Sequence, residues 1–340
     1  MTLPSVASLR LGVWIALVAA SAWIWRVSTE KPGRPDPPAG VIVLRDLTYR
    51  VVEGRRLALD LYLPDAANPA PGGPCPVLVA IHGGSWIGGS RTEYGPQFAR
   101  LTREGIAVAV VDYRLARPGA PSWPGAPADI AAALDWLEAH ATQYRLDPDR
   151  VAVIGTSSGG LLAALASFLD PRIRAAICLS APMDLAKLMT ERSLAHEPAL
   201  AFLGDAPRGL AHRAREASPT SLVAPGQPPM LLIHGTKDLW VPIEQARNMR
   251  HALDEAGVLH RLIEIEGARH GFQLQVEEPQ PRDLATDILD FLEEAWGTRV
   301  VHPGRENPAI PGAPGGSPLV RGSSFLKSAT EGGTMEIRTS

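Results

Sequence analysis

Cysteine is scarce in this 340-residue sequence, which contains only Cys75 and Cys178. Two cysteines cannot form a disulfide framework, and their spacing matches no metal-binding motif. Cys178 lies within an apolar run and is predicted to be a small buried hydrophobic residue. The sequence leaves open a single disulfide between the two cysteines, and it predicts no metal site.

An excess of charge of one sign is also lacking. The 33 lysines and arginines nearly balance the 36 aspartates and glutamates, and the formal net charge is -3. Nucleic-acid-binding surfaces typically combine clustered basic residues with aromatic ones, and the sequence contains no such cluster. We therefore expect no nucleic-acid partner.

The apolar run at residues 11–25 is shorter than the roughly 20 residues that a spanning helix needs. Its length fits the apolar part of a signal peptide, and Ala20 and Ala22 form a small-x-small cleavage site. Cleavage there would leave an apolar start at Trp23, which favours an uncleaved anchor instead. We predict that residues 1–26 are a signal peptide or an N-terminal membrane anchor. The protein is then expected to be exported (periplasmic or secreted) or held at the membrane through residues 11–25, rather than cytoplasmic.

The rest of the chain divides by composition. Residues 27–40 are rich in proline and predict a linker, and residues 41–296 predict one globular domain. Within that domain, residues 184–225 are irregular with short helical pieces, and we expect them to form a small lid. Residues 297–340 are dominated by proline, glycine, serine and charge, which predicts a disordered tail.

The domain alternates between strand and helix patterns. Two alternating segments around Glu53 and Gly54 predict an antiparallel hairpin. Continuous apolar runs, typical of strands buried on both faces, follow at residues 77–81, 106–111, 151–154, 175–179, 230–233 and 261–265. Helices are predicted between and after them, at residues 97–104, 129–144, 160–166, 243–256 and 282–296. This order predicts an α/β fold with a mostly parallel, eight-stranded sheet covered by helices on both faces.

Polar and glycine-rich stretches follow several of these strands. They are residues 82–86 (HGGSW), 155–159 (GTSSG), 234–238 (HGTKD) and 267–272 (GARHGF). Ligands of parallel α/β sheets bind beyond the carboxyl ends of the strands. We therefore expect these four stretches to meet in one site.

Ser157 is the candidate nucleophile. It lies in a G-x-S-x-G motif between a predicted strand and a predicted helix, which is the context of a nucleophile elbow. Without that context the motif would also fit an ordinary glycine- and serine-rich turn. The following helix directs its N-terminus at the same position and favours developing negative charge.

A serine nucleophile needs a base and an acid that orients the base. Among nine histidines, His270 lies in a glycine-flanked loop after the last strand, from which its ring can reach Ser157. His82 and His234 precede glycines at strand ends, and we expect them to stabilise turns.

Asp238 follows a strand and precedes His270, giving the order Ser, Asp, His that is typical of this fold. Asp205, Asp254 and Glu266 are weaker candidates for the acid. The oxyanion needs backbone donors, and we assign the amides of Gly84, Ser85 and Ser158.

These motifs resemble those of the α/β-hydrolase esterases of the hormone-sensitive-lipase and bacterial feruloyl- and acetyl-xylan-esterase-like groups. The resemblance covers about residues 45–295 and rests on residues 82–86, 112–115 (DYRL), 155–159, 234–238 with 241–242, and 270–272. It implies carboxylic-ester hydrolysis through an acyl-enzyme, with no metal or organic cofactor. It also implies that residues 112–115 position the oxyanion loop at residues 82–86, which is a structural and not a catalytic role.

One residue departs from the lipase-like pattern. Ser85 stands where those esterases usually carry a third glycine, and a bulkier residue there is also found in kynurenine-formamidase-like relatives. The sequence therefore leaves open an amide or formamide hydrolase, a serine peptidase, or a non-enzymatic binding protein on the same fold.

Trp86, Thr156 and Trp240 are the candidate substrate-pocket residues, and Trp123 could also line the pocket. Aromatic residues near strand ends are more often simply part of the packing. No long apolar lid helix is predicted, which disfavours long-chain lipase activity. The expected substrates are short-chain esters or acyl esters on carbohydrates, including polysaccharides.

Overall fold

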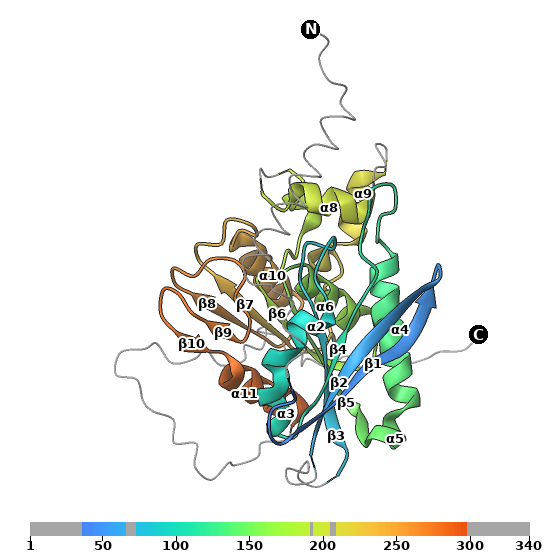
Figure 1. Cartoon of the computed structure of the whole chain (residues 1–340). Coiled ribbons are helices and arrows are strands. Elements are labelled where there is room, and N and C mark those ends of the chain that lie inside the picture. Colours follow the sequence, from blue (N-terminus) through green and yellow to red (C-terminus); the bar gives the residue numbers. More distant parts are fainter. Residues whose placement is uncertain (1–35, 66–72, 191–192, 205–208, 298–340) are drawn as a thin grey trace, which may run out of the picture.

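The computed structural model describes residues 36–65, 73–190, 193–204 and 209–297 (Figure 1). The predicted signal or anchor segment, most of the linker and the predicted tail lie outside the described residues and stay predictions. None of the described helices has the length and apolar character needed to cross a membrane.

One eight-stranded sheet forms the centre of the domain, in the order β1-β2-β4-β3-β5-β6-β7-β8. Strands β1 and β2 pair antiparallel, as do β2 and β4, and all further pairs are parallel. The predicted mostly parallel sheet of eight strands is confirmed. The strands are β1 (Val41–Val52), β2 (Arg55–Pro64), β3 (Cys75–Ile81), β4 (Ala107–Val111), β5 (Leu146–Thr156), β6 (Ile173–Leu179), β7 (Met230–Gly235) and β8 (His260–Ile265).

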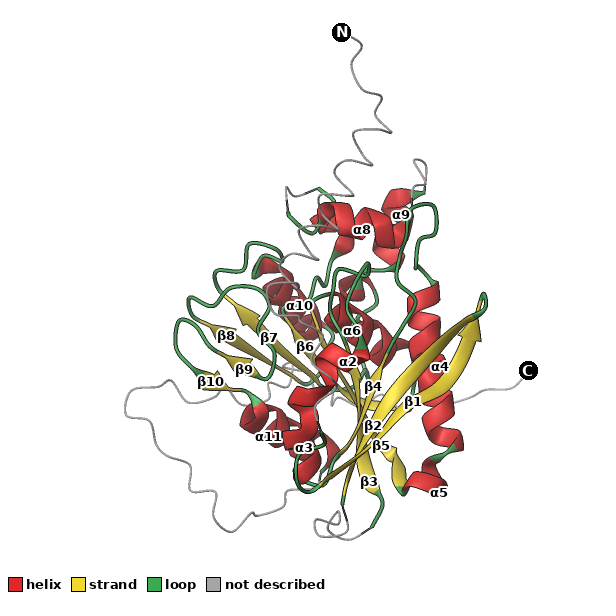
Figure 2. Ribbon diagram, viewed as in Figure 1, coloured by secondary structure: helices red, strands yellow, loops and turns green. Residues whose placement is uncertain are grey.

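Helices cover both faces of this sheet (Figure 2). Helices α4, α6 and α10 pack on one face, and α3 and α11 pack on the other. The helices are α2 (Arg91–Tyr94), α3 (Ala99–Arg103), α4 (Gly125–Ala139), α5 (Ala141–Tyr144), α6 (Ser158–Leu169), α7 (Leu185–Leu188), α8 (His196–Leu203), α9 (Leu210–Glu216), α10 (Glu244–Glu255) and α11 (Ala285–Trp296). Short 3₁₀ turns lie at Gly95–Phe98 and Pro219–Ser221, and β9 (Gln275–Val276) pairs with β10 (Arg282–Asp283).

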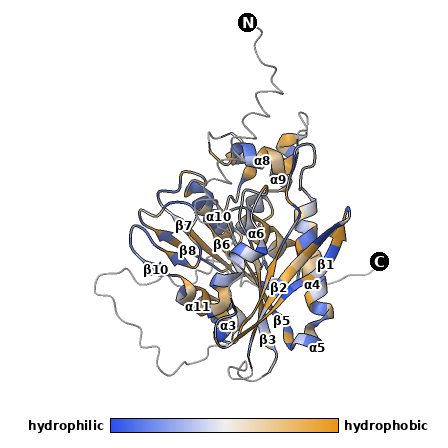
Figure 3. Cartoon of the chain, viewed as in Figure 1, coloured by the Kyte–Doolittle hydropathy of each residue, from blue (hydrophilic) through white to orange (hydrophobic). Residues whose placement is uncertain are grey.

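The two-sided cover explains the continuous apolar runs. Along β3, Val77, Val79 and Ile81 face the core under α4 and α6, whereas Leu78 and Ala80 face the core under α3 and α11. Successive side chains of a strand point to opposite faces, so a strand buried on both faces must be apolar throughout. Figure 3 shows apolar residues concentrated on the central strands and mixed colouring on the helices.

The hairpin turn forms as predicted, because Glu53 and Gly54 both have positive φ, at 51° and 74°. Two positive φ angles are typical of the tight turns that match the twist of paired strands. The two cysteines are both buried and free, so no disulfide joins them.

Two predicted helix boundaries were wrong. Helix α11 begins at Ala285 instead of residue 282, because Arg282 and Asp283 pair with β9. Helix α4 begins at Gly125, four residues before the predicted start. The start of α11 is therefore fixed by a tertiary contact and not by local propensity.

The segment predicted as a lid follows β6 and contains α7, α8 and α9. Figure 1 shows α8 and α9 at the top of the molecule, beyond the strands. The described helices of this segment are short, and the longest, α8, has eight residues. Its role as a lid stays a prediction.

Candidate active site

Ser157 lies at a sharp turn between β5 and α6, with φ 54° and ψ -122°. The flanking glycines are required by close backbone approach. A Cβ atom on Gly155 would lie 2.1 Å from the carbonyl oxygen of Gly159, and a Cβ atom on Gly159 would lie 2.2 Å from that of Ile81. A non-glycine residue with positive φ is strained, so the surrounding packing must hold Ser157 in place.

The structure brings the three predicted triad residues together. His270 Nε2 lies 3.0 Å from Ser157 Oγ, and His270 Nδ1 lies 2.6 Å from Asp238 Oδ2. Asp238 comes from the loop after β7 and His270 from the loop after β8. These are the distances needed for proton transfer between a hydroxyl and an imidazole that a carboxylate orients.

Asp238 is held by several donors. Its side chain is fully buried, and its Oδ1 accepts hydrogen bonds from the Trp240 and Val241 amides, both at 2.9 Å. His234 Nε2 donates to the Val241 carbonyl at 2.8 Å and lies 3.4 Å from Asp238 Oδ2. Burial alone would raise the pKa of Asp238, but hydrogen bonds from His234, His270 and the Val241 amide hold that pKa well below its usual range. Asp238 is therefore ionised at neutral pH.

The predicted oxyanion loop, at residues 82–86, borders Ser157. A Cβ atom on Gly83 would lie 2.8 Å from the Thr156 carbonyl oxygen and 3.5 Å from Ser157 Cβ. Within the described residues, the amides of Gly84 and Ser85 donate no hydrogen bond to the protein. The third predicted donor, Ser158, begins α6, where the first amides of a helix have no partner within the helix.

The three predicted pocket residues have different surroundings. Trp86 is buried and stacks on Phe202, with ring centroids 4.7 Å apart. The Thr156 hydroxyl bonds to the buried Tyr94 hydroxyl at 2.8 Å. Trp240 is partly exposed, and its ring centroid lies 6.4 Å from that of His270. Of the three, Trp240 has the surroundings of a residue that substrate can touch.

The remaining sequence candidates lie outside the triad. His82 donates from Nδ1 to the Gly83 carbonyl at 2.7 Å, and His234 likewise binds a backbone carbonyl, as expected of residues that stabilise turns. Asp254 lies on α10 and pairs with His260, at 3.5 Å, and Glu266 is exposed after β8. Asp205 lies outside the described residues.

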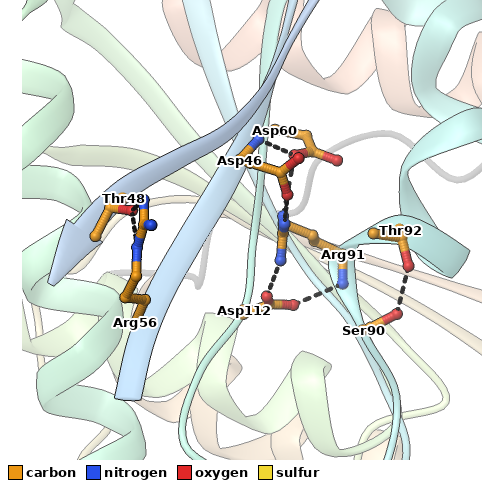
Figure 4. Close-up of polar contacts among 8 residues, drawn as sticks. All are labelled: Asp46, Thr48, Arg56, Asp60, Ser90, Arg91, Thr92 and Asp112. Carbon is orange, nitrogen blue, oxygen red and sulfur yellow. Dashed lines mark hydrogen bonds and ion pairs between the residues drawn. The ribbon is translucent and has the colours of Figure 1, made fainter. Parts of the chain in front are cut away.

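Sequence reasoning missed the residue that anchors the chain just after the predicted oxyanion loop at residues 82–86. Arg91 begins α2, directly after this loop, and its guanidinium contacts the carboxylates of Asp46, Asp60 and Asp112 (Figure 4). Its backbone amide also donates to Asp112 Oδ1 at 2.8 Å. The resemblance implied that residues 112–115 position the loop, and a lone arginine after a glycine- and serine-rich stretch was the available signal for the partner of Asp112.

Replacing Arg91 with methionine is expected to lower the free energy of unfolding by about 3 kcal/mol, because it leaves buried carboxylate without its cation. Arg91 is 11% exposed and Asp60 is 3% exposed. Urea denaturation measures the change. The matched control is Arg247→Met, which removes a surface pair with Glu264 and should cost less than about 1 kcal/mol. Equal losses in the two variants would contradict a structural role for the Arg91 cluster.

The chain is similar in sequence to known esterases, in agreement with the geometry of this site. Residues 59–253 match the model of the BD-FAE family, which is more than half of the chain. The chain belongs to the BD-FAE family. It is 30% identical to the esterase LipC of Mycobacterium tuberculosis over 80% of this chain and 72% of LipC. It is 31% identical to the esterase LipQ of the same organism over 73% of this chain, and it spans 61% of the length of LipQ.

The fold is also that of a solved esterase. The thermophilic esterase 2 of Thermogutta terrifontis is 26% identical, covers 78% of this chain and 95% of its own length, and superposes with a TM-score of 0.61. The protein therefore has the α/β-hydrolase fold and is a carboxylic-ester hydrolase.

Proposed function

We propose that this protein cleaves carboxylic esters through a covalent acyl-enzyme on Ser157. The observation that carries the proposal is the continuous chain of hydrogen bonds from Ser157 Oγ through His270 to the buried Asp238. A serine hydroxyl is a poor nucleophile on its own, and an adjacent, oriented imidazole activates it.

In this mechanism Ser157 Oγ attacks the ester carbonyl carbon while His270 Nε2 takes the hydroxyl proton. The carbonyl oxygen becomes an oxyanion, which the amides of Gly84, Ser85 and Ser158 stabilise. Collapse of this intermediate releases the alcohol, which receives the proton from His270. Water then attacks the acyl-enzyme while His270 takes its proton, the bond between Ser157 Oγ and the acyl carbon breaks, and the proton passes to Ser157 Oγ as the acid product leaves.

Asp238 keeps its negative charge throughout. Its hydrogen bond to Nδ1 fixes the tautomer in which Nε2 can accept the serine proton, and its charge stabilises the imidazolium that forms. The low pKa of Asp238 supports this role, because a carboxylate that stays ionised does not take the proton from His270.

We propose short-chain esters, or short acyl esters on carbohydrates, as the substrates. The described lid helices α7, α8 and α9 have four, eight and seven residues, which offers little apolar surface to a long chain. Trp240, beside His270, is the side chain proposed to contact substrate.

The experiment is turnover of p-nitrophenyl acetate, butyrate and palmitate, of acetylated xylan and of N-formylkynurenine by the full chain. A fluorophosphonate probe followed by peptide mass spectrometry identifies the nucleophile. We expect fast short-chain ester turnover, slow palmitate turnover and a single adduct on Ser157. Turnover of the formamide alone would make the protein an amide hydrolase instead, and an adduct on another residue would refute the mechanism.

A further inference from the structure

The oxyanion loop has an unusual backbone at three consecutive residues. Gly84 has φ 118°, and the next two residues, Ser85 and Trp86, have φ 56° and 60° although they carry side chains. L-residues rarely adopt these angles, and two in succession are costly. Contacts elsewhere must therefore hold the loop in the shape that leaves the Gly84 and Ser85 amides available.

Trp86 makes the contacts that offset this cost. Its side chain is 1% exposed, and its ring stacks on the ring of Phe202 with centroids 4.7 Å apart and planes 16° apart. Its carbonyl accepts a hydrogen bond from the Ala116 amide at 2.7 Å. The loop is thus held by the side chain of Phe202, on α8 in the segment predicted as a lid.

Phe202 is itself fixed in place. Its carbonyl accepts a hydrogen bond from the Trp123 amide at 3.0 Å, and the ring of Trp123 packs edge-on against it at 5.8 Å. The next carbonyl, of Leu203, accepts a bond from Arg213 on α9 at 2.9 Å. Helix α8 is therefore held by contacts to the Trp123 segment and to α9 where it presents Phe202 to Trp86.

We propose that Phe202 is a positioning residue for the oxyanion loop, acting through its stack with Trp86. The proposal rests on the proposed function, because it assigns to this contact the placement of the Gly84 and Ser85 amides. It makes the segment between β6 and β7 part of the catalytic architecture, since loss of the stack lets the left-handed residues relax and moves the donors.

The test compares Phe202→Leu with Phe291→Leu. Both phenylalanines are fully buried, and Phe291 lies on α11 in the core on the opposite face of the sheet. We expect Phe202→Leu to lower kcat for p-nitrophenyl butyrate at least about tenfold with little change in KM. The loss in kcat should stay below the ~10²- to 10³-fold loss caused by removing one oxyanion donor. Phe291→Leu should lower the melting temperature similarly and leave kcat unchanged.

Inhibition by phenylboronic acid separates a positioning role of Phe202 from a purely structural one, because a purely structural role would leave the inhibition constant unchanged. Its tetrahedral adduct with serine places an oxygen at the oxyanion position, so its inhibition constant should rise in Phe202→Leu by about the same factor as kcat falls. Phe202→Met, whose flexible side chain adapts to irregular gaps, serves if the leucine variant does not fold. Wild-type kcat in a folded variant, or a lower kcat with unchanged boronate inhibition, would overturn the proposal. An inactive wild type, or an active Ser157→Ala variant, would instead overturn the proposed function.

Discussion

Ser157→Ala is expected to lower kcat for p-nitrophenyl butyrate by about 10⁶-fold, to a level near the uncatalysed rate plus what binding and the oxyanion amides supply. The substitution removes the only atom that forms the acyl bond, and it leaves His270 with no hydroxyl at 3.0 Å to deprotonate. The variant should fold, because alanine fits wherever serine fits and the backbone strain at this position is unchanged. Steady-state turnover and circular dichroism measure the two effects.

The matched control is Ser167→Ala on α6, the helix that follows Ser157. Ser167 is buried and donates to the Ala164 carbonyl at 2.8 Å, so its loss costs a hydrogen bond without touching the triad. Turnover by the control should equal that of the wild type. If Ser157→Ala retained more than about one thousandth of wild-type turnover, the acyl-enzyme mechanism would be wrong.

Asp238→Asn is expected to lower kcat by about 10⁴-fold at neutral pH. The asparagine oxygen can still accept from the Trp240 and Val241 amides, as Oδ1 does now, which directs its NH₂ group at His270 Nδ1. His270 must then carry its proton on Nε2, and an Nε2–H cannot accept the proton of Ser157. The fold is kept, and the base is held in the wrong tautomer.

The pH dependence follows from the direction of the Asp238 pKa shift. A carboxyl group whose pKa is lower in the folded state stabilises the fold fully above its unfolded pKa, near 4, and this contribution is lost as pH falls through the folded value. The difference in unfolding free energy between wild type and Asp238→Asn should therefore be constant between about pH 6 and pH 8 and shrink only in acid.

The control for the activity of Asp238→Asn is Asp254→Asn, on the exposed part of α10, which should keep full activity. Full activity in Asp238→Asn would mean that another carboxylate orients His270.

Hydrophobic patterns along the sequence predicted the strands of the central sheet well. The buried strands were visible because a strand covered on both faces must be apolar at every position, as β3 shows. Ser157, Asp238 and His270 were identifiable because parallel strands all end at one edge, so residues after different strands meet there. Ends of elements were less predictable, since the start of α11 depends on the pairing of Arg282 and Asp283 with β9.

Contacts between distant side chains left no pattern in the sequence. Arg91 meets Asp46 and Asp60, which come from β1 and β2, and no spacing relates these three positions. The stack of Trp86 on Phe202 is of the same kind, because an aromatic residue after β3 and another on α8 each look like ordinary packing. Such pairs are fixed by how the elements pack in three dimensions, which local propensity does not encode.

The separation of the triad along the chain has a consequence for how the active enzyme is assembled. The hydrogen bond that Ser157 donates to His270 spans 113 residues, and the bond from the Leu274 amide to Gln97 spans 177. Contacts of such sequence separation must overcome a large loop-closure entropy and tend to form late in folding. A nascent chain that ends before residue 270 contains Ser157 but lacks the base. Ester hydrolysis is therefore a property of the finished sheet, and its return during refolding marks the docking of the last strands rather than the collapse of the core.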